Sequence, residues 1–312
     1  MKLIRGLHGL EQWHKTSVVT IGNFDGIHLG HQQMLVKLCE QARRLQVPSV
    51  LVTFEPLPHE FFAGTNAPLR LMGLREKLQY LSANSDLDGV LCLPFNKKLS
   101  HLSAEQFVSD VLLDGLSAQY ILLGDDFRFG YQRRGDFALL QNMADKSGFQ
   151  VESMPSFIID DTRVSSTKVR NALADGEVEQ ATQLLGRPYC LSGRVVKGDQ
   201  LGRTIGYPTA NIHCRRQNLA LAGVFAVRLH GVAGEAQLGM ANIGFRPTVD
   251  GRVLRFEVNL FDFDGDIYDQ YVEVEFMTQL RDEQRFDSLD ALKAQLAADE
   301  RVAREYFAAV LS

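Results

Sequence analysis

The sequence predicts an α/β protein of two domains: a parallel sheet in residues 1–185 and an antiparallel β-barrel with terminal helices in residues 186–312. In the first part, apolar runs typical of buried strands alternate with amphipathic helical patterns. Near Gly186 this alternation gives way to one strand-like segment after another, separated by turn glycines. The length of 312 residues also suits two hydrophobic cores.

The composition is that of an ordinary globular protein, with 45% hydrophobic and 23% charged residues. A net charge of −5 argues against a nucleic-acid partner, because phosphate backbones attract basic surfaces. The four cysteines are widely spaced and form no metal-binding pattern, which favours reduced thiols. The first residues lack the apolar core of a signal peptide, and no run is long enough to span a membrane. We therefore expect a cytoplasmic protein without a membrane partner; its oligomeric state is not indicated.

Strands and helices are expected to alternate along the first domain. A strand at 18–21 leads through a glycine turn into a helix that ends near Leu45, before Pro48. A capping box of Ser103 and Gln106 and a terminal Gly148 mark two later helices. Further strands are predicted at 49–54, 89–95, 118–124 and 149–154, and further helices at 71–84, 103–116 and 137–148.

The turn GNFDGIHLGH, residues 22–31, lies between the first of these strands and its helix. Backbone N–H groups at such a helix start, together with the positive end of the helix dipole, favour anion binding. His28 and His31 are three residues apart, so both would face one way and donate hydrogen bonds to phosphate oxygens. The alternative is that they are solvated surface histidines.

SSTKVR, residues 165–170, is a second candidate anion site, because a serine pair precedes a helical pattern that closes at Gly176. The serines can simply cap this helix, or they can present hydroxyl and N–H groups to an anion beside Lys168 and Arg170. Taken with the histidine turn, they indicate two anion-binding helix starts in one domain.

Two loops that follow predicted strands combine aromatic residues with charges: FEPLPHEFF (54–62) and DDFRFGYQRRGD (125–136). Because the carboxyl ends of parallel strands meet at one edge of a sheet, these loops are expected to gather there. Such residues suit a planar ring that needs a stacking surface and a polar edge, although each phenylalanine can equally be core. The phenylalanines concerned are Phe54, Phe61, Phe62, Phe127 and Phe129.

In the second domain, five or six antiparallel strands are expected to close into a barrel. Alternation along one of them puts Val253, Arg255, Glu257 and Asn259 on one face. The strand-like segments are 189–198, 223–231, 236–244, 253–263 and 267–280, and two helical stretches follow at 288–300 and 301–312.

Three features of the second domain are chemical candidates. Gly198, Gly202 and Gly206 make a loop that can approach phosphates, although glycine loops are common. Thr209 and Asn211 lie two residues apart, so on an extended chain their oxygens point the same way, as ligands of Mg²⁺ would. Glu257 can take a proton from an alcohol, or it can be an ordinary surface carboxylate.

The order GNFDGIHLGH, FEPLPHEFF, GDDFRFG and RVSSTKVR resembles the FAD synthetase half of the bacterial bifunctional riboflavin kinase/FAD synthetases, over about residues 15–185. The resemblance implies a Rossmann-like nucleotidylyltransferase fold that transfers AMP from ATP to FMN with Mg²⁺, releasing pyrophosphate. It implies that His28 and His31 are catalytic. It also implies that ATP is bound by Gly22, Asn23, Asp25, Arg163, Ser166, Thr167 and Arg170, and flavin by Phe54, Pro56, Phe62, Asp126, Phe127 and Arg128. Leu57 stands at a position where this family often has histidine.

GRTIGYPTAN, NIGFRPT, LRFEV and FDFDGDIY resemble the riboflavin kinase half of the same family, over about residues 187–300. The resemblance implies that Thr209 and Asn211 bind Mg²⁺ with ATP and that Glu257 is the general base for the riboflavin 5′-hydroxyl. It also implies that Gly198, Gly202 and Arg203 cover the phosphates. Tyr207, Asn259 and Asp269 depart from the family pattern.

The sequence therefore predicts an enzyme that phosphorylates riboflavin to FMN and then adenylylates FMN to FAD, using ATP for both steps. One alternative keeps the adenylyltransferase but makes the barrel a non-catalytic flavin-binding module, for which Glu257, Thr209 and Asn211 would be unnecessary. A second is an adenylyl- or cytidylyltransferase for a nicotinamide or pantetheine precursor, which the histidine turn permits and the aromatic loops disfavour.

Overall fold

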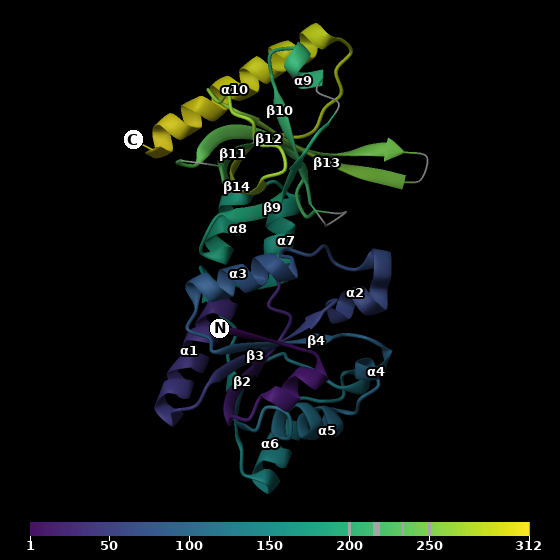
Figure 1. Ribbon diagram of the computed structural model, residues 1–312, viewed down its shortest axis with the longest axis vertical. Helices are drawn as coiled ribbons and strands as arrows, with labels where there is room; N and C mark the ends of the chain where they lie inside the picture. The colour runs from purple at the N-terminus through teal and green to yellow at the C-terminus, as the bar shows by residue number, and fades with distance from the viewer. Residues whose placement is uncertain (199–200, 215–218, 233, 249–250, 312) are drawn as a thin grey trace. The chain divides into compact units, whose positions relative to one another are not determined.

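The computed structural model describes residues 1–198, 201–214, 219–232, 234–248 and 251–311 (Figure 1). The side chains of 201, 203, 245–248, 251–253 and 311 also lie outside the description. The chain forms two compact units. The N-terminal unit comprises residues 1–68 and 73–165, and the barrel unit comprises residues 69–72 and 166–312.

The N-terminal unit is built on a six-stranded parallel sheet in the order β1-β4-β3-β2-β5-β6. Its central strands are apolar on both faces, as a sheet covered on two sides requires. The predicted parallel sheet is confirmed, and β1, an edge strand with a single buried residue, Ile4, was not predicted. The strands are β1 (Lys2–Arg5), β2 (Ser17–Ile21), β3 (Ser49–Glu55), β4 (Gly89–Pro94), β5 (Ala118–Gly124) and β6 (Gln150–Met154).

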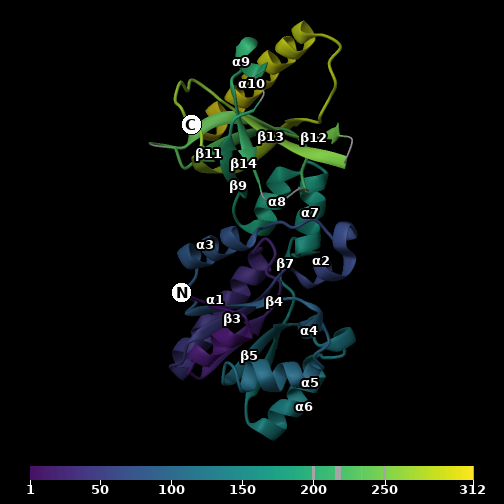
Figure 2. The same ribbon diagram turned by 45° about the vertical axis from the view of Figure 1, so that its right-hand side comes forward.

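Helices cover both faces of this sheet (Figures 1 and 2). Right-handed crossovers place α1 (Leu29–Leu45) and α3 (Leu74–Asn84) on one face. The other face carries α5 (Ala104–Gln106), which continues as a π-helix over Phe107–Leu113, and α6 (Phe137–Ser147). The capping box of Ser103 and Gln106 and the left-handed Gly148 are present as predicted. Short elements complete the unit: α2 (Pro58–Ala63), α4 (Lys97–Ser100), the strand pair β7 (Ile158–Ile159) and β8 (Thr162–Arg163), and 3₁₀ turns at Leu7–Gln12, Gly64–Asn66 and Tyr131–Arg133.

The strand order reverses beside β2. From β2 the chain moves to β3 and β4 on one side, and then returns to β5 on the other side of β2. The loops that follow β2 and β5 therefore leave the sheet in opposite directions, at the switch point where such sheets commonly bind ligands. The histidine turn follows β2 and the segment from Asp125 follows β5, so both lie at this switch point.

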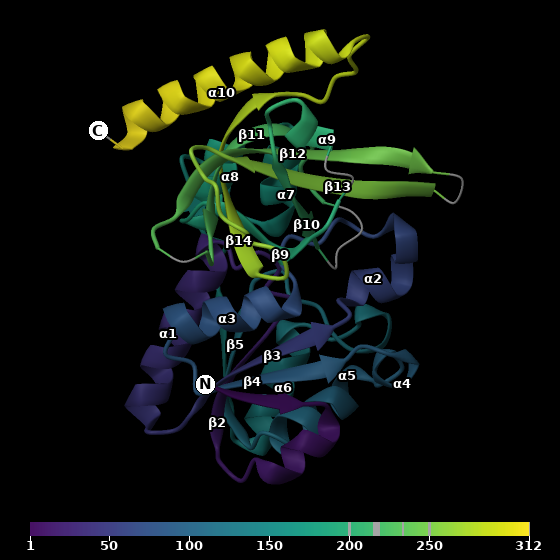
Figure 3. The same ribbon diagram turned by 45° about the horizontal axis from the view of Figure 1, so that its top comes forward.

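The barrel unit is a closed six-stranded barrel in the order β10-β13-β12-β11-β14-β9, with antiparallel pairing (Figure 3). Phe225, Phe256 and Phe276 fill its interior. The predicted barrel is confirmed. Its strands are β9 (Tyr189–Val196), β10 (Thr209–His213), β11 (Gly223–His230), β12 (Gln237–Thr248), β13 (Gly251–Leu260) and β14 (Tyr271–Arg281).

Four helices accompany the barrel: α7 (Ser166–Ala174), α8 (Val178–Leu185), α9 (Leu201–Thr204) and α10 (Leu289–Leu311). The prediction of two terminal helices was wrong, because α10 is a single helix of 23 residues. Asp299, near the expected junction of 288–300 and 301–312, lies within the helix and is buried against Arg281. Within the described part of the chain, none of the helices has the length and apolar character needed to cross a membrane.

Candidate active sites

The histidine turn is fixed at both ends by the sheet and by α1. Gly22 N–H donates to the carbonyl of Val52 at 3.0 Å, and His28 is the N-terminal cap residue of α1. The rings of His28 and His31 stack with centroids 3.6 Å apart, and Phe24 stacks on His31 at 4.5 Å. The expectation that the two histidines face one way is thus met.

The backbone of this turn is strained. Phe24 and Ile27 have φ values of 46° and 44°, a region that bulky side chains rarely adopt. Both side chains are fully buried, so packing compensates the strain. A Cβ on Gly30 would lie 3.3 Å from Nδ1 of His28, so a larger residue there would displace the His28 ring by a few tenths of an ångström. The strained residues Phe24 and Ile27 and the tightly packed Gly30 thus all lie next to the two histidines.

His31 is held neutral by its surroundings. Burial, the neighbouring His28 and the charge of Lys77 all lower the pKa of His31 well below its ordinary value. Its Nδ1 atom is buried and has no hydrogen-bond partner among the described residues. A buried polar atom without a partner is costly, and a bound polar ligand would satisfy it.

Beyond β5, an ion-pair group joins residues expected to bind phosphate and flavin. Arg163 lies 2.5 Å from Asp126 and 3.6 Å from Asp125. Asp125 also accepts hydrogen bonds from the backbone N–H and hydroxyl of Ser156. Arg128, in contrast, pairs with Asp136, the cap residue of α6.

Three of the five predicted phenylalanines converge on Phe95, which the sequence assigned only to a strand. Phe54, Phe61 and Phe62 each meet the Phe95 ring edge-on, with centroids 5.5–5.7 Å apart. Phe54 is 8% exposed and belongs to the core, whereas Phe62 is 70% exposed. Phe127 stacks on the buried Phe129 at 5.8 Å. Pro56 is exposed, and Leu57, at the position of departure from the family pattern, is buried.

The second predicted anion site is the start of α7, which begins at Ser166 in the barrel unit. Thr167 is exposed, and Arg170 Nε donates to the carbonyl of Leu69 at 2.5 Å. This helix start and the histidine turn belong to different units. That they bind one triphosphate stays a prediction.

In the barrel, Glu257 of β13 lies between two asparagines. The antiparallel register places it opposite Asn211 of β10 and opposite Asn242 of β12. Thr209 lies opposite Asn259, whose Nδ2 donates to the carbonyl of Pro208 at 2.8 Å. Arg255 Nε is 3.9 Å from a carboxylate oxygen of Glu257. The predicted one-sided face is confirmed for Arg255, Glu257 and Asn259, while the Val253 side chain lies outside the description.

This polar face opens into a cavity of about 340 Å³ between the barrel, α9 and α10. Thr209, Asn211 and Glu257 line it, together with apolar residues from the barrel and from the segment 286–296. The sequence did not assign α10 to this site, because the helix lies more than thirty residues beyond Glu257. Its apolar residues also recur at the spacing of any helix that packs on a core. The apolar residues are Ile205, Val224, Met240, Phe286, Leu289, Leu292 and Leu296.

A second cavity, of about 390 Å³, lies beside the first and shares Thr209 with it. It is lined by Pro208, Val258 and the segment 263–268. This segment is the last six residues of the FDFDGDIY motif (261–268), to which the sequence assigned no role. Thr209 thus lies where two cavities of different character meet.

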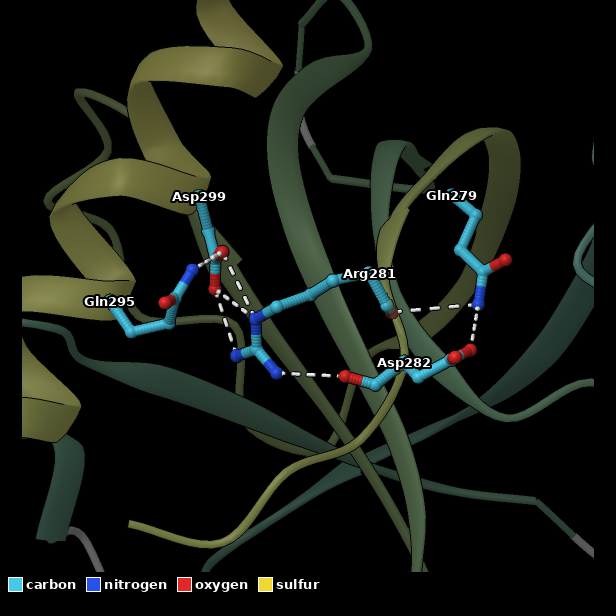
Figure 4. Close-up of polar contacts among 5 residues, drawn as sticks. All are labelled: Gln279, Arg281, Asp282, Gln295 and Asp299. Carbon is cyan, nitrogen blue, oxygen red and sulfur yellow. Dashed lines mark hydrogen bonds and ion pairs between the residues drawn. The ribbon is translucent and has the colours of Figure 1, made fainter.

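A network around Arg281 attaches α10 to the end of β14 (Figure 4). The guanidinium donates through Nε and Nη2 to the Asp299 carboxylate at 2.9–3.0 Å, and through Nη1 to the carbonyl of Asp282. Gln295 donates to the same carboxylate at 2.8 Å. The Asp299 side chain is 3% exposed and that of Arg281 is 18% exposed, so this is a buried pair. Because Arg281 also lines the first cavity, the network fixes one cavity wall.

The predicted phosphate loop is described only in part. A Cβ on Gly198 would lie 2.2 Å from Nδ2 of Asn211, so a close approach requires glycine there. Gly202 lies in α9, and its carbonyl accepts from the N–H of Tyr207 at 2.9 Å. The side chain of Arg203 and residues 199–200 lie outside the description.

The fold is a doubly wound α/β domain, of the class that binds nucleotides at its switch point, joined to a closed antiparallel barrel. A family model for FAD synthetase matches residues 10–168, and one for riboflavin kinase matches residues 185–307. The chain belongs to the family of bifunctional riboflavin kinases/FMN adenylyltransferases. These matches favour the principal interpretation over both alternatives raised from the sequence.

Relatives described as bifunctional riboflavin kinase/FMN adenylyltransferase match nearly end to end. The Escherichia coli K12 protein is 49% identical, covering 98% of each chain, and that of Pseudomonas fluorescens is 48% identical, covering 97% of each. A crystal structure described as a macrolide-efflux protein from Streptococcus pneumoniae has a TM-score of 0.84 and 33% identity, covering 97% of this chain and 99% of that one.

Proposed function

We propose that this chain forms FAD by two reactions that use separate groups of residues, one around His28 and His31 and the other around Glu257. The observation that carries this proposal is the presence of two distinct polar centres, the stacked histidines in the N-terminal unit and Glu257 opposite Asn211 in the barrel unit. We assign adenylylation of FMN to residues 1–185 and phosphorylation of riboflavin to residues 186–312.

Adenylyl transfer needs no protein nucleophile, because an oxygen of the FMN phosphate attacks the α-phosphorus of ATP and pyrophosphate leaves. Catalysis then consists of alignment and stabilisation of charge on the phosphate oxygens. His28 and His31 donate hydrogen bonds to these oxygens at the positive end of α1. Further contacts to ATP come from Gly22, Asn23, Asp25, Arg163, Ser166, Thr167 and Arg170.

FMN is proposed to lie against the aromatic loops of the N-terminal unit. Exposed Phe62 and half-buried Phe127 offer ring surfaces, whereas Phe54 acts from the core beneath them. Asp126 and Arg128 supply charged groups near β5, and Pro56 borders the loop after β3. Support comes from the shared contacts of Phe54 and Phe62 with Phe95.

Phosphoryl transfer in the barrel begins when Glu257 takes the proton of the riboflavin 5′-hydroxyl. The hydroxyl oxygen then bonds to the γ-phosphorus of ATP, and ADP leaves. The apolar cavity beside α10 suits the flavin ring, and the neighbouring cavity lined by 263–268 suits the nucleotide. Gly198, Gly202 and Arg203 cover the phosphates.

Magnesium fits the donor chemistry of the barrel site. Thr209 and Asn211 offer hard oxygen ligands two residues apart on β10, and Glu257 lies opposite Asn211. Within the described residues, no group of three or more His, Cys, Asp or Glu is placed to hold a metal ion. When bound with ATP, Mg²⁺ neutralises phosphate charge. The substrates exist in the cytoplasm, where we place the enzyme.

The proposal is tested by incubating the purified chain with riboflavin, ATP and Mg²⁺ and separating the flavins by chromatography. FMN should form first and FAD should follow, and removal of Mg²⁺ with EDTA should stop both steps. If supplied FMN is adenylylated but bound riboflavin is never phosphorylated, the barrel is a binding module. If neither reaction occurs, the assignment is wrong.

A further inference from the structure

Lys77 is a buried cation at the base of the histidine turn. It lies in α3, and the residue is only 2% exposed. Its Nζ donates to the carbonyl of Asn23 at 2.6 Å and lies 3.5 Å from the hydroxyl of Thr53. That hydroxyl donates to the same carbonyl at 3.3 Å. Lysine is rarely buried to this extent, because the ammonium loses its hydration.

The Asn23 carbonyl connects Lys77 to the catalytic histidines. Asn23 is followed by Phe24, which has the strained φ of 46°. The Phe24 ring stacks on His31 at 4.5 Å, and His31 stacks on His28 at 3.6 Å. The hydrogen bond from Lys77 to the Asn23 carbonyl therefore also holds in place the Phe24 ring, on which the two histidine rings stack. Without it, the strained turn can relax and the rings can shift.

Lys77 also acts electrostatically on the histidine pair. The groups that act on His31 are His28 from the same turn and Lys77 from α3, and both lower the pKa of His31. Asp25, the acidic residue of the turn, is itself buried. Because Lys77 is only 2% exposed, its charge is weakly screened by solvent. A positive potential behind the histidines would favour the negative triphosphate.

We propose that Lys77 is a positioning residue for adenylyl transfer: it holds the histidine pair through the Asn23 carbonyl and keeps a positive charge behind the phosphate site. This inference rests on the function proposed above for His28 and His31. It assigns no contact between Lys77 and the substrate.

The test is Lys77→Met in the full chain, with Lys146→Met, an exposed lysine on α6 of the same unit, as the matched control. A misplacement of about 1 Å in the catalytic groups lowers turnover about 100-fold, and we expect a loss of kcat of that order for FAD formation from FMN. The loss in kcat should exceed the rise in KM for ATP, and riboflavin phosphorylation should be unchanged. Lys146→Met should match the wild type.

A role in folding alone would not move the titration of His31. In Lys77→Met, removal of the positive charge should raise the pKa of His31 toward its ordinary value, as measured by NMR of labelled histidine. The acid limb of the pH profile for FAD formation should move to higher pH with it. Thr53→Val removes the hydroxyl that donates to Asn23 and lies 3.5 Å from Lys77 Nζ, but it keeps the lysine charge. It should therefore lower kcat less and leave the pKa of His31 unchanged.

If Lys77→Met does not fold, Lys77→Gln, which keeps a hydrogen-bond donor but no charge, is used for the same titration and kinetics. An unchanged acid limb and unchanged kcat in a folded charge-removing variant would overturn the inference. His31→Ala is measured in parallel, and it distinguishes a failure of the role proposed for Lys77 from a failure of the role proposed for the histidines. If His31→Ala still forms FAD at the wild-type rate, it is the role of the histidines that fails.

Discussion

We propose that His28 and His31 serve adenylyl transfer only, because they lie in the N-terminal unit whereas Glu257 lies in the barrel unit. Replacing both histidines by alanine removes two hydrogen-bond donors from the developing charge on phosphate. We expect FAD formation from FMN to fall by roughly 10²–10³-fold or more, as for loss of other preorganised donors. FMN formation from riboflavin should be retained. Chromatography of the flavins measures both rates, and an equal loss of both would contradict the separation of sites.

Glu257→Gln is the complementary substitution. It keeps the size and hydrogen-bonding capacity of the side chain but removes the proton acceptor, so riboflavin phosphorylation should fall by roughly 10²–10⁴-fold. Adenylylation of supplied FMN should continue, since the N-terminal unit is untouched. Phosphorylation at the wild-type rate would mean that another group accepts the proton.

Residues that act within a short motif could be predicted from the sequence. His28 and His31 share one turn, and Thr209 and Asn211 share one strand, so their spacing alone predicts a common direction. Lys77, Phe95 and Arg281 could not be predicted in this way. Each becomes part of a site only through contact with an element distant in sequence, as Lys77 of α3 does with Asn23.

At the scale of elements, α10 depends on the buried pair of Arg281 and Asp299 for its place on the barrel. Asp299→Ala leaves the guanidinium buried without its carboxylate, and the free energy of unfolding should fall by about 3–5 kcal/mol. The KM for riboflavin should rise, because α10 forms a wall of the cavity. Denaturant unfolding and steady-state kinetics measure these effects.

Glu305→Ala, also on α10, is the matched control for this prediction. Glu305 pairs with Arg301, but both side chains are mostly exposed, at 65% and 71%. A solvated pair contributes little to stability. If the two variants unfold alike, the Arg281 network does not fix α10.

The elements themselves were largely predictable, because the periodicity of two for strands and 3.6 for helices follows directly from which faces are buried. Two failures have physical causes. β1 is an edge strand of four residues with little apolar signal. The terminal helix, expected as the two stretches 288–300 and 301–312, is continuous, and the ion pair that buries Asp299 within it joins residues too far apart for any local pattern to reveal.

For the whole molecule, the boundary of the barrel unit decides which fragment can fold. α8 contacts β9 and β14, and its buried side chains cover them. A fragment of residues 187–312 would expose this surface, whereas a fragment of residues 166–312 retains it. We expect the shorter fragment to melt at least about 5 °C lower by circular dichroism. Equal melting temperatures would show that α7 and α8 are dispensable. The buried residues of α8 are Val178, Ala181, Leu184 and Leu185.

The chain passes between the two units more than once, and this limits how the units can be exchanged between proteins. The backbone leaves the N-terminal unit at residue 69, returns at 73 and leaves again after 165. Residues 69–72 are retained by partners in the second unit, such as the Tyr189 hydroxyl that donates to the carbonyl of Leu71 at 3.1 Å. Two domains that follow one another along the chain can be exchanged at a single fusion point. In this protein, a chimaera that exchanges only the C-terminal residues would keep residues 69–72 of the original chain, which pack on the original barrel unit. Residues 69–72 must therefore be exchanged together with the barrel.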